Sequence, residues 1–372
     1  MDDLEHCRPW LVLLRTPGLG PSRLRRELDT QQGDIEATLE AFRRKGAAQP
    51  GPARDWLRQP DAARLAADLA WLAEPGHRLL TCLDEDFPPQ LADIPQPPVA
   101  LFTAGDTGLL LLPQVAIVGA RAASLGGRTH ARAFAQALGW AGFAITSGMA
   151  DGIDGAAHQA ALEAGLPTVA VVGTGPDLAY PRRHRELARR IAAHGAMVSE
   201  FPPGTPARSD HFPRRNRILS GLALGTLVVE AGLRSGSLIT ARLAAEQGRE
   251  VFALPGSIHN PLARGCHQLL RDGARLVESA SEIVEVLAPA ARALGCELAS
   301  RLEAAGVPSP RTPPDAAGQV LLDALGHGPM ALDELAACTG LAVADLAPAL
   351  LMLELDGRIE VLPGGRYQRL PD

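Results

Sequence analysis

Short apolar segments recur along the middle of the chain, from about residue 75 to residue 288, and alanine-rich amphipathic segments separate most of them. These apolar segments lack polar alternation, which is typical of strands buried on both faces of a mainly parallel sheet. The predicted strands are 115–118, 143–147, 168–172, 196–199, 226–230, 250–254 and 275–277. Because crossovers between parallel strands are right-handed, the pattern predicts an α/β fold with a Rossmann-like, doubly wound parallel sheet over residues 73–288.

The segment before this sheet, residues 1–72, is predicted to form a small helical domain that is SAM-like or helix-hairpin-helix-like. Leu24 and Leu28 recur at helical spacing after the turn Pro17–Gly20. The amides of such a turn can hold a DNA phosphate, but a plain turn between packed helices is favoured here. After the sheet, residues 289–314 are rich in alanine and proline and are predicted to be a linker.

The last segment, residues 315–372, is predicted to be a winged-helix-like domain. Helices are expected at 317–325, 332–339 and 343–355, and a hairpin is expected around the Pro-Gly-Gly at 363–365. The third of these helices carries acidic residues and no arginine. Insertion of this helix into a DNA groove is therefore disfavoured, and a protein contact or simple packing is favoured.

Composition sets limits on the class of protein. The net charge of −6 excludes a chain coated in positive charge, although arginines are concentrated at 182–190 and 208–217. The most apolar run, 108–120, is too short to span a bilayer, and the N-terminus lacks the apolar part of a secretion signal, so we expect a cytoplasmic protein with no membrane partner. The five cysteines lie far apart, so neither disulfides nor a metal site is expected.

The sequence VAIVGARAASLGG, residues 115–127, begins like a dinucleotide-binding motif. The G-x-G-x-x-G fingerprint would require glycine where Arg121 and Ser124 stand, so a nicotinamide cofactor is improbable and no cofactor is expected. Glycine-rich turns also follow other predicted strands, at 148–152, 173–175 and 230–237. Turns of this kind at one edge of a parallel sheet are typical of an anion-binding site.

The segment HFPRRNRILSG, residues 211–221, is predicted to start a helix near Phe212 or Pro213. Arg214, Arg215 and Arg217 then crowd the first turns, where the helix dipole disfavours cations. An anion bound there would explain these arginines, and Phe212 would add a face on which a base can stack, as in single-stranded nucleic acid sites. The alternative is a solvated basic turn beside a core phenylalanine.

Other polar residues near these turns have structural interpretations that are favoured over catalysis. Asp151 is a plausible N-cap, and Asp154 and His158 are expected to share a hydrogen bond on a helix surface rather than to bind a metal. Ser235 and Ser237 are expected to cap the next helix, because no base stands at a motif-like spacing. The residues therefore suggest no catalytic set.

Motifs in a fixed order through the central domain resemble the DprA family (DNA processing protein A, also called Smf). The segments that carry the resemblance include VAIVGARAASLGG, ITSGMADGIDGAAHQAAL, SEFPPGTPARSDHFPRRNRILSGLA and VVEAGLRSGSLIT. The resemblance implies a Rossmann-like domain that binds and protects single-stranded DNA without catalysis. It also implies a homodimer formed through that domain and loading of RecA recombinase in natural transformation or related recombination.

The resemblance also assigns roles to residues of this chain. Arg121 would hold a backbone phosphate, with Gly119 and Ser124 beside it, and Phe212 would stack on a base. The residues expected to line the same pocket are Arg182, Arg214, Arg215 and Arg217.

Three alternatives stay open. The first is a nucleotide-processing hydrolase of the LOG (lysine-decarboxylase-like) type, although its P-G-G-x-G-T-x-x-E signature is absent and VVEAGLRSGSLIT is only a loose analogue. The second is a nicotinamide-dependent oxidoreductase. The third is a DNA-binding regulator that works through residues 315–372.

Overall fold

The computed structural model describes residues 2–46, 51–304, 316–325, 330–339, 358–362 and 366–369, together with Leu346, Leu350 and Leu353. The chain divides into two compact units, residues 1–298 and 299–372. Each unit has a hydrophobic core of its own. Among the described residues, no helix combines the length and apolar character that a bilayer crossing requires.

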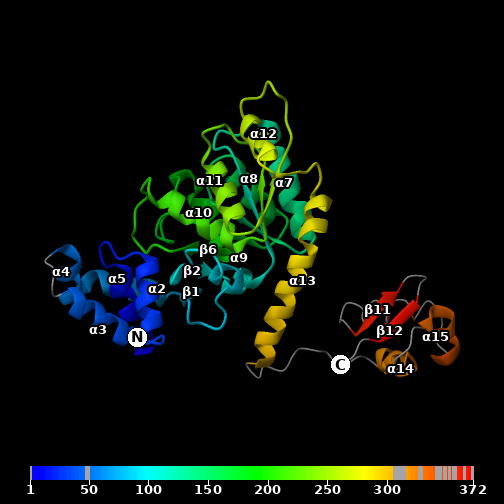
Figure 1. The fold of residues 1–372 in the computed structure, drawn as a ribbon, viewed down its shortest axis with the longest axis horizontal. Coiled ribbons are helices and arrows are strands. Elements are labelled where there is room, and N and C mark those ends of the chain that lie inside the picture. The colour runs from blue at the N-terminus through cyan, green and yellow to red at the C-terminus, as the bar shows by residue number, and fades with distance from the viewer. Residues whose placement is uncertain are drawn as a thin grey trace. The chain divides into compact units, whose positions relative to one another are not determined.

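A nine-stranded sheet forms the centre of the first unit, in the order β1-β2-β6-β5-β4-β3-β7-β8-β9. Figure 1 labels its strands β1, β2 and β6, beside the N-terminal helices. The strands are β1 His77–Thr81, β2 Ala100–Gly105, β3 Gln114–Val118, β4 Ala144–Ser147, β5 Thr168–Val171, β6 Ala196–Ser199, β7 Gly225–Val228, β8 Glu250–Ala253 and β9 Arg275–Leu276. Strands β3 to β9 pair in parallel, whereas β2 is antiparallel to both of its neighbours, β6 and the edge strand β1. The predicted doubly wound fold is confirmed, and the antiparallel pair is an addition that the prediction lacked.

The direction of winding changes between β3 and β7. The chain places β4, β5 and β6 in turn on one side of β3 and then returns to place β7 on its other side, where Val115 pairs with Gly225. The loops after β3 and β7 therefore diverge at the carboxyl end of the sheet. Such a switch point is where open parallel sheets bind their ligands.

Helices cover both faces of the sheet because neighbouring residues of each strand point to opposite sides. Val115 and Ile117 of β3 belong to the core under α7, α8 and α13, whereas Ala116 and Val118 belong to the core under α10 and α11. The helices after β3 are α7 Leu125–Trp140, α8 Ile153–Glu163, α9 Arg185–His194, α10 His211–Leu222, α11 Gly236–Glu246, α12 Arg264–Arg271 and α13 Ala280–Ala304. Shorter elements are α6 Pro89–Ala92 and the 3₁₀ helices η2 Thr107–Leu111 and η3 Arg182–His184.

The N-terminal segment is helical, as predicted, and packs against the β1 and β2 edge of the sheet. Its elements are η1 Asp2–Cys7, α1 Arg8–Leu14, α2 Pro21–Thr30, α3 Ile35–Gly46, α4 Pro52–Arg58 and α5 Ala62–Leu72. Trp10 of α1, Trp71 of α5 and Phe102 of β2 are buried in one core, with the Trp71 and Phe102 ring centroids 6.2 Å apart. This shared core joins the helices to the sheet in one compact unit.

Helix α13 corrects part of the predicted linker, since it extends to Ala304 and makes residues 289–304 helical. Pro289 lies inside this helix, where a proline normally weakens it. Leu287 and Leu294 on either side are buried, and their packing favours a continuous helix over the linker that the alanine and proline content predicted. Residues 305–314 of the predicted linker lie outside the described residues.

The described part of the second unit contains two of the three predicted helices and both strands of the predicted hairpin. Its described elements are α14 Ala316–Leu325, β10 Met330–Ala331, α15 Leu332–Thr339, β11 Ile359–Leu362 and β12 Arg366–Arg369. The strands form an antiparallel sheet in the order β10-β12-β11 around buried leucines such as Leu321 and Leu335. Most of the predicted helix 343–355 and the Pro-Gly-Gly turn lie outside the described residues.

Candidate nucleic-acid interface

A cavity of about 790 Å³ opens at the switch point of the large sheet. Its walls come from the loop after β3, the loop after β7 and the first turns of α10. Four of the eight residues predicted for the site line this cavity, namely Gly119, Arg121, Phe212 and Arg215. The fold therefore brings together two segments that are some ninety residues apart in the sequence.

The loop that carries Arg121 is held in place by close packing at glycines. A β-carbon on Gly119 would lie 2.5 Å from Cγ1 of Ile153, and one on Gly152 would lie 2.2 Å from the carbonyl oxygen of Ala120. Gly152 also has a φ of +78°, which L side chains rarely adopt. These contacts press the loop after β3 against the start of α8 and fix the backbone from which Arg121 extends.

Arg121 and Phe212 are direct neighbours at the mouth of the cavity. The Arg121 guanidinium carbon lies 5.6 Å from the centre of the Phe212 ring, and that ring lies 5.4 Å from the ring of Tyr180. A β-carbon on Gly173 would lie 3.1 Å from the Phe212 ring, so the glycine-rich turn after β5 leaves room for it. Arg121 is exposed and Phe212 half-buried, which leaves a cation and an aromatic ring at the surface side by side.

Arg215 is buried beneath this pair and binds backbone carbonyls. Its guanidinium donates to the carbonyl oxygens of Gly148 (2.8 Å) and Val171, at the ends of β4 and β5. Burial lowers the pKa of Arg215 to about 10, the nearby carboxylate of Asp154 opposes this shift, and the charge of Arg121 adds to it. Arg215 therefore stays protonated near neutral pH and supplies a fixed positive charge in the cavity wall.

The expected hydrogen bond between Asp154 and His158 is wrong, because α8 buries both side chains. Asp154 accepts instead from the amides of Gly148 (3.1 Å) and Ala150 (3.4 Å), and burial raises its pKa while Arg215 opposes that shift. His158 shares a hydrogen bond of 2.7 Å with the Thr168 hydroxyl, and burial lowers its pKa to about 3. Asp154 therefore supports the turn after β4, and His158 joins α8 to the start of β5.

Asp151 is also not the N-cap that the sequence suggested, since Gly152 takes that position in α8. The carboxylate of Asp151 instead forms an ion pair with Arg183 and lies 3.2 Å from Nε2 of His184. The prediction that Ser235 caps the next helix is confirmed, because its hydroxyl accepts from the amide of Ser237 at the start of α11.

Arg214 and Arg217 do not line the switch-point cavity. Both pair with Glu200, which follows β6: Arg217 is buried against the carboxylate, and Nε of Arg214 donates to it at 2.9 Å. Burial lowers the pKa of Arg217, and Glu200 opposes the shift. The anion that the sequence led us to expect beside these two arginines is therefore a carboxylate of the protein itself.

Ser124 and Arg182 also lie outside the cavity lining. Ser124 is the N-cap of α7, and its hydroxyl donates to Glu230 (2.6 Å) while accepting from the amide of Gly127 (2.9 Å). The amide of Ser124 donates to the other oxygen of Glu230 at 2.9 Å. Glu230 thus occupies the helix N-terminus where a dinucleotide fold would bind phosphate. Arg182 is exposed at the start of η3.

Comparison with known proteins decides the family. Residues 78–288 match the model of DNA recombination-mediator protein A, and residues 305–365 match the DprA winged helix domain. The chain is 44% identical to protein Smf of Escherichia coli (strain K12) over 313 residues, which cover 82% of this chain and 81% of that protein. The chain belongs to the DprA/Smf family. These matches do not favour the alternative of a LOG-type nucleotide-processing hydrolase.

Two solved DprA structures share the fold of this family member. The X-ray structure of DprA from Streptococcus pneumoniae is 37% identical with a TM-score of 0.65, covering 75% of this chain and 97% of that one. DprA from Helicobacter pylori, studied for its single-stranded DNA binding mode, is 28% identical with a TM-score of 0.52. This match covers 57% of this chain and 96% of the Helicobacter pylori chain.

The cavity of this DprA-family protein has further polar residues that the sequence prediction missed. Arg208, Asn216 and Arg234 all line it, as does Tyr180. A signal was present for each arginine, because Arg208 begins the basic segment 208–217 and Arg234 lies in the glycine-rich loop after β7. The sequence analysis named both segments but did not select these two arginines from them.

Proposed function

We propose that this protein binds single-stranded DNA in the switch-point cavity, protects the strand and helps to load RecA recombinase onto it. The observation that carries the proposal is the exposed Arg121 guanidinium beside the Phe212 ring, with the buried charge of Arg215 behind them. A phosphate and its neighbouring base need this combination of a cation and a stacking face. The Helicobacter pylori relative, which is described as a single-stranded DNA binder, supports the same ligand.

The proposal describes a binding protein and not an enzyme. Of the three serines in the cavity wall, Ser235 and Ser237 have hydroxyls 2.6 Å apart that bond to each other at the start of α11. Asp154, a carboxylate in the same wall, accepts bonds from two backbone amides. These polar groups form hydrogen bonds within the loops around the cavity. Groups bonded in this way favour a binding role over nucleophilic or acid-base catalysis.

The partners in the proposal follow the family resemblance. We propose that the protein forms a homodimer through the Rossmann-like domain. We also propose that it binds RecA in the cytoplasm. Light scattering of the purified chain, and RecA filament formation on coated single strands with and without it, test these two parts separately.

Fluorescence anisotropy with labelled oligonucleotides tests the DNA-binding part of the proposal. We expect tighter binding to a single strand than to duplex, and Arg121→Ala should weaken single-strand binding about tenfold, since a charged hydrogen bond to phosphate is lost. The same change should make the negative slope of log K against log salt shallower by about 0.7. Phe212→Leu should weaken binding by about 1 to 3 kcal/mol through the lost stacking.

The matched control is Arg128→Ala, which removes an exposed arginine of α7 that does not line the cavity. Its affinity and salt slope should equal those of the unchanged protein. Equal affinity for duplex and single strand, or an unchanged slope for Arg121→Ala, would overturn the assignment.

A further inference from the structure

A second groove, of about 650 Å³, lies between the N-terminal helices and the loop that joins β6 to α10. One wall is the α1–α2 turn, residues 14–21, with Trp56 and Arg64 beside it. The other wall contains Phe201, Arg208, His211 and Arg214, among other residues of the β6–α10 segment. The turn Pro17–Gly20, for which the sequence favoured packing alone, therefore borders an open groove.

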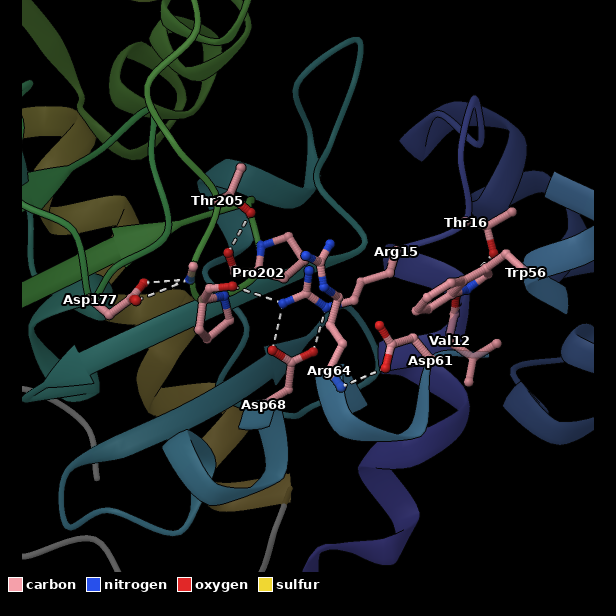
Figure 2. A network of polar contacts seen from close by, with 12 residues as sticks. Val12, Arg15, Thr16, Trp56, Asp61, Arg64, Asp68, Asp177, Pro202 and Thr205 are labelled. Carbon is pink, nitrogen blue, oxygen red and sulfur yellow. Dashed lines mark hydrogen bonds and ion pairs between the residues drawn. The ribbon is translucent and has the colours of Figure 1, made fainter. Parts of the chain in front are cut away.

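The two walls are tied together by Arg15, at the end of α1. Its guanidinium binds both carboxylate oxygens of Asp68 in α5 at 2.5 Å and donates to the carbonyl oxygen of Pro203 at 2.8 Å. Figure 2 shows Arg15 extending from the helices toward the loop after β6. Trp56 donates from Nε1 to the carbonyl oxygen of Val12 at 2.8 Å. These hydrogen bonds therefore hold the walls of the groove in place.

Cations and a stacked aromatic pair line this groove. Arg64 and Arg208 are exposed, and the side chain of Arg214 is 42% exposed. The His211 ring stacks on Phe201 with centroids 4.0 Å apart, and His211 is half-buried whereas Phe201 is buried. A groove with arginines and an aromatic face matches the requirements of a nucleotide chain, as the switch-point cavity does.

The carboxylates near the groove do not cancel this charge. Glu200 is shared by two arginines, Arg214 and the buried Arg217. Arg208 pairs with Asp210 at 3.2 Å, but both side chains are well exposed, and such pairs contribute little. A phosphate can therefore replace Asp210 as the partner of Arg208 at small cost.

The groove adjoins the switch-point cavity at Arg208. Arg208 lines both of them. The first two residues of α10 divide between them, because His211 lines the groove and Phe212 lines the cavity. A strand that leaves the cavity across the start of α10 passes Arg208 and reaches the groove.

We propose that the groove binds the next nucleotides of the same single strand, so that the N-terminal helices supply a second part of the DNA path. This inference rests on the proposed function, because it takes the strand in the switch-point cavity as its starting point. Because Arg208 lines both the cavity and the groove, a strand bound in the cavity can extend into the groove, which favours DNA over an acidic peptide as the occupant. Arg64 is the residue that reports on the groove alone, since it lines the groove and not the cavity.

The test compares a short and a long oligo-dT, of about 6 and about 20 nucleotides, so that only the long one can fill both parts. Arg64→Ala should leave the affinity for the short strand unchanged and weaken the long strand about threefold to fivefold. Its negative slope of log K against log salt should become shallower by about 0.7 with the long strand only. Arg26→Ala, which removes an exposed arginine of α2 outside the groove, is the matched control, and Arg64→Lys should restore most of the binding.

Each outcome separates the two proposals. If Arg121→Ala weakens both strands while Arg64→Ala matches the Arg26→Ala control at both lengths, the groove is not part of the DNA path and the switch-point assignment stands. An equal loss for short and long strands in Arg64→Ala would also overturn the groove as an extension. If Arg121→Ala changes neither strand, the switch-point assignment and this inference both fail.

Discussion

Two helices begin at the carboxyl edge of the same sheet, and their N-termini are satisfied in different ways. Helix α7 starts at Ser124, where the carboxylate of Glu230 accepts from both the amide and the hydroxyl of that residue. Helix α10 has Asp210 at its N-cap with no side-chain cap bond, and its first turn contains no acidic residue. The first turns of α10 contain arginines instead. Of Arg214, Arg215 and Arg217, only Arg215 lines the cavity.

The difference shows that resemblance to a cofactor motif does not locate the ligand. The motif-like turn before α7 is closed by a carboxylate of the protein, which fills the position of a bound phosphate. The start of α10, which resembles no cofactor motif, lies beside the open cavity. The three predictions below test this contrast, beginning with the largest effect.

The first prediction concerns the arginine of α10 that the protein pairs internally. Arg217→Met should lower the free energy of unfolding by about 3 kcal/mol, because it removes one partner of a buried ion pair and leaves Glu200 with only the half-exposed Arg214. Urea denaturation measures this loss. Arg214→Met is the control and should cost much less, since Arg217 remains with the carboxylate.

The same pair of variants separates structure from binding. Folded Arg217→Met protein should keep its affinity for single-stranded DNA within about twofold. A stable variant that had lost DNA binding would show that Arg217 faces the strand, and the division of the α10 arginines would then be incorrect.

The second prediction concerns the closed N-terminus of α7. Glu230→Ala should lower the free energy of unfolding by about 2 kcal/mol, because the donors of Ser124 lose their buried acceptor. Glu230→Gln keeps an acceptor oxygen and should lose less. Sulfate should raise the melting temperature of Glu230→Ala more than that of the unchanged protein, since an anion can then reach the vacated helix end. An equal response to sulfate would argue against Glu230 as a substitute for phosphate.

The smallest effect is expected at Arg182. Its side chain is exposed in η3 and does not line the cavity, so Arg182→Ala should change single-strand affinity by less than about threefold. The measurement is the anisotropy titration used for Arg121→Ala, run in parallel. A tenfold loss would extend the DNA path over η3 and restore the single pocket that the family resemblance implied.

The sequence predicted well the features that depend on local pattern. The seven predicted strands correspond to β3 to β9, and the helix expected near Phe212 begins at His211. The cap at Ser235 was also predicted from its own segment. Apolar runs, turns and caps are set by neighbouring residues, so these features can be recognised without the fold. The strands β1 and β2 were not predicted. A linker was predicted from Pro289 onward, whereas this proline lies inside helix α13.

Only the tertiary structure decided which arginines are available to a ligand. Glu200 follows β6 and Glu230 follows β7, and the fold brings the first to Arg214 and Arg217 and the second to Ser124, 106 positions away in the sequence. Residue type and spacing predicted a basic, aromatic segment, but pairing and burial depend on which loops meet at the carboxyl edge of the sheet. Arg121 became the exposed cation beside Phe212 because the winding direction changes between β3 and β7, and that change is a property of the whole sheet.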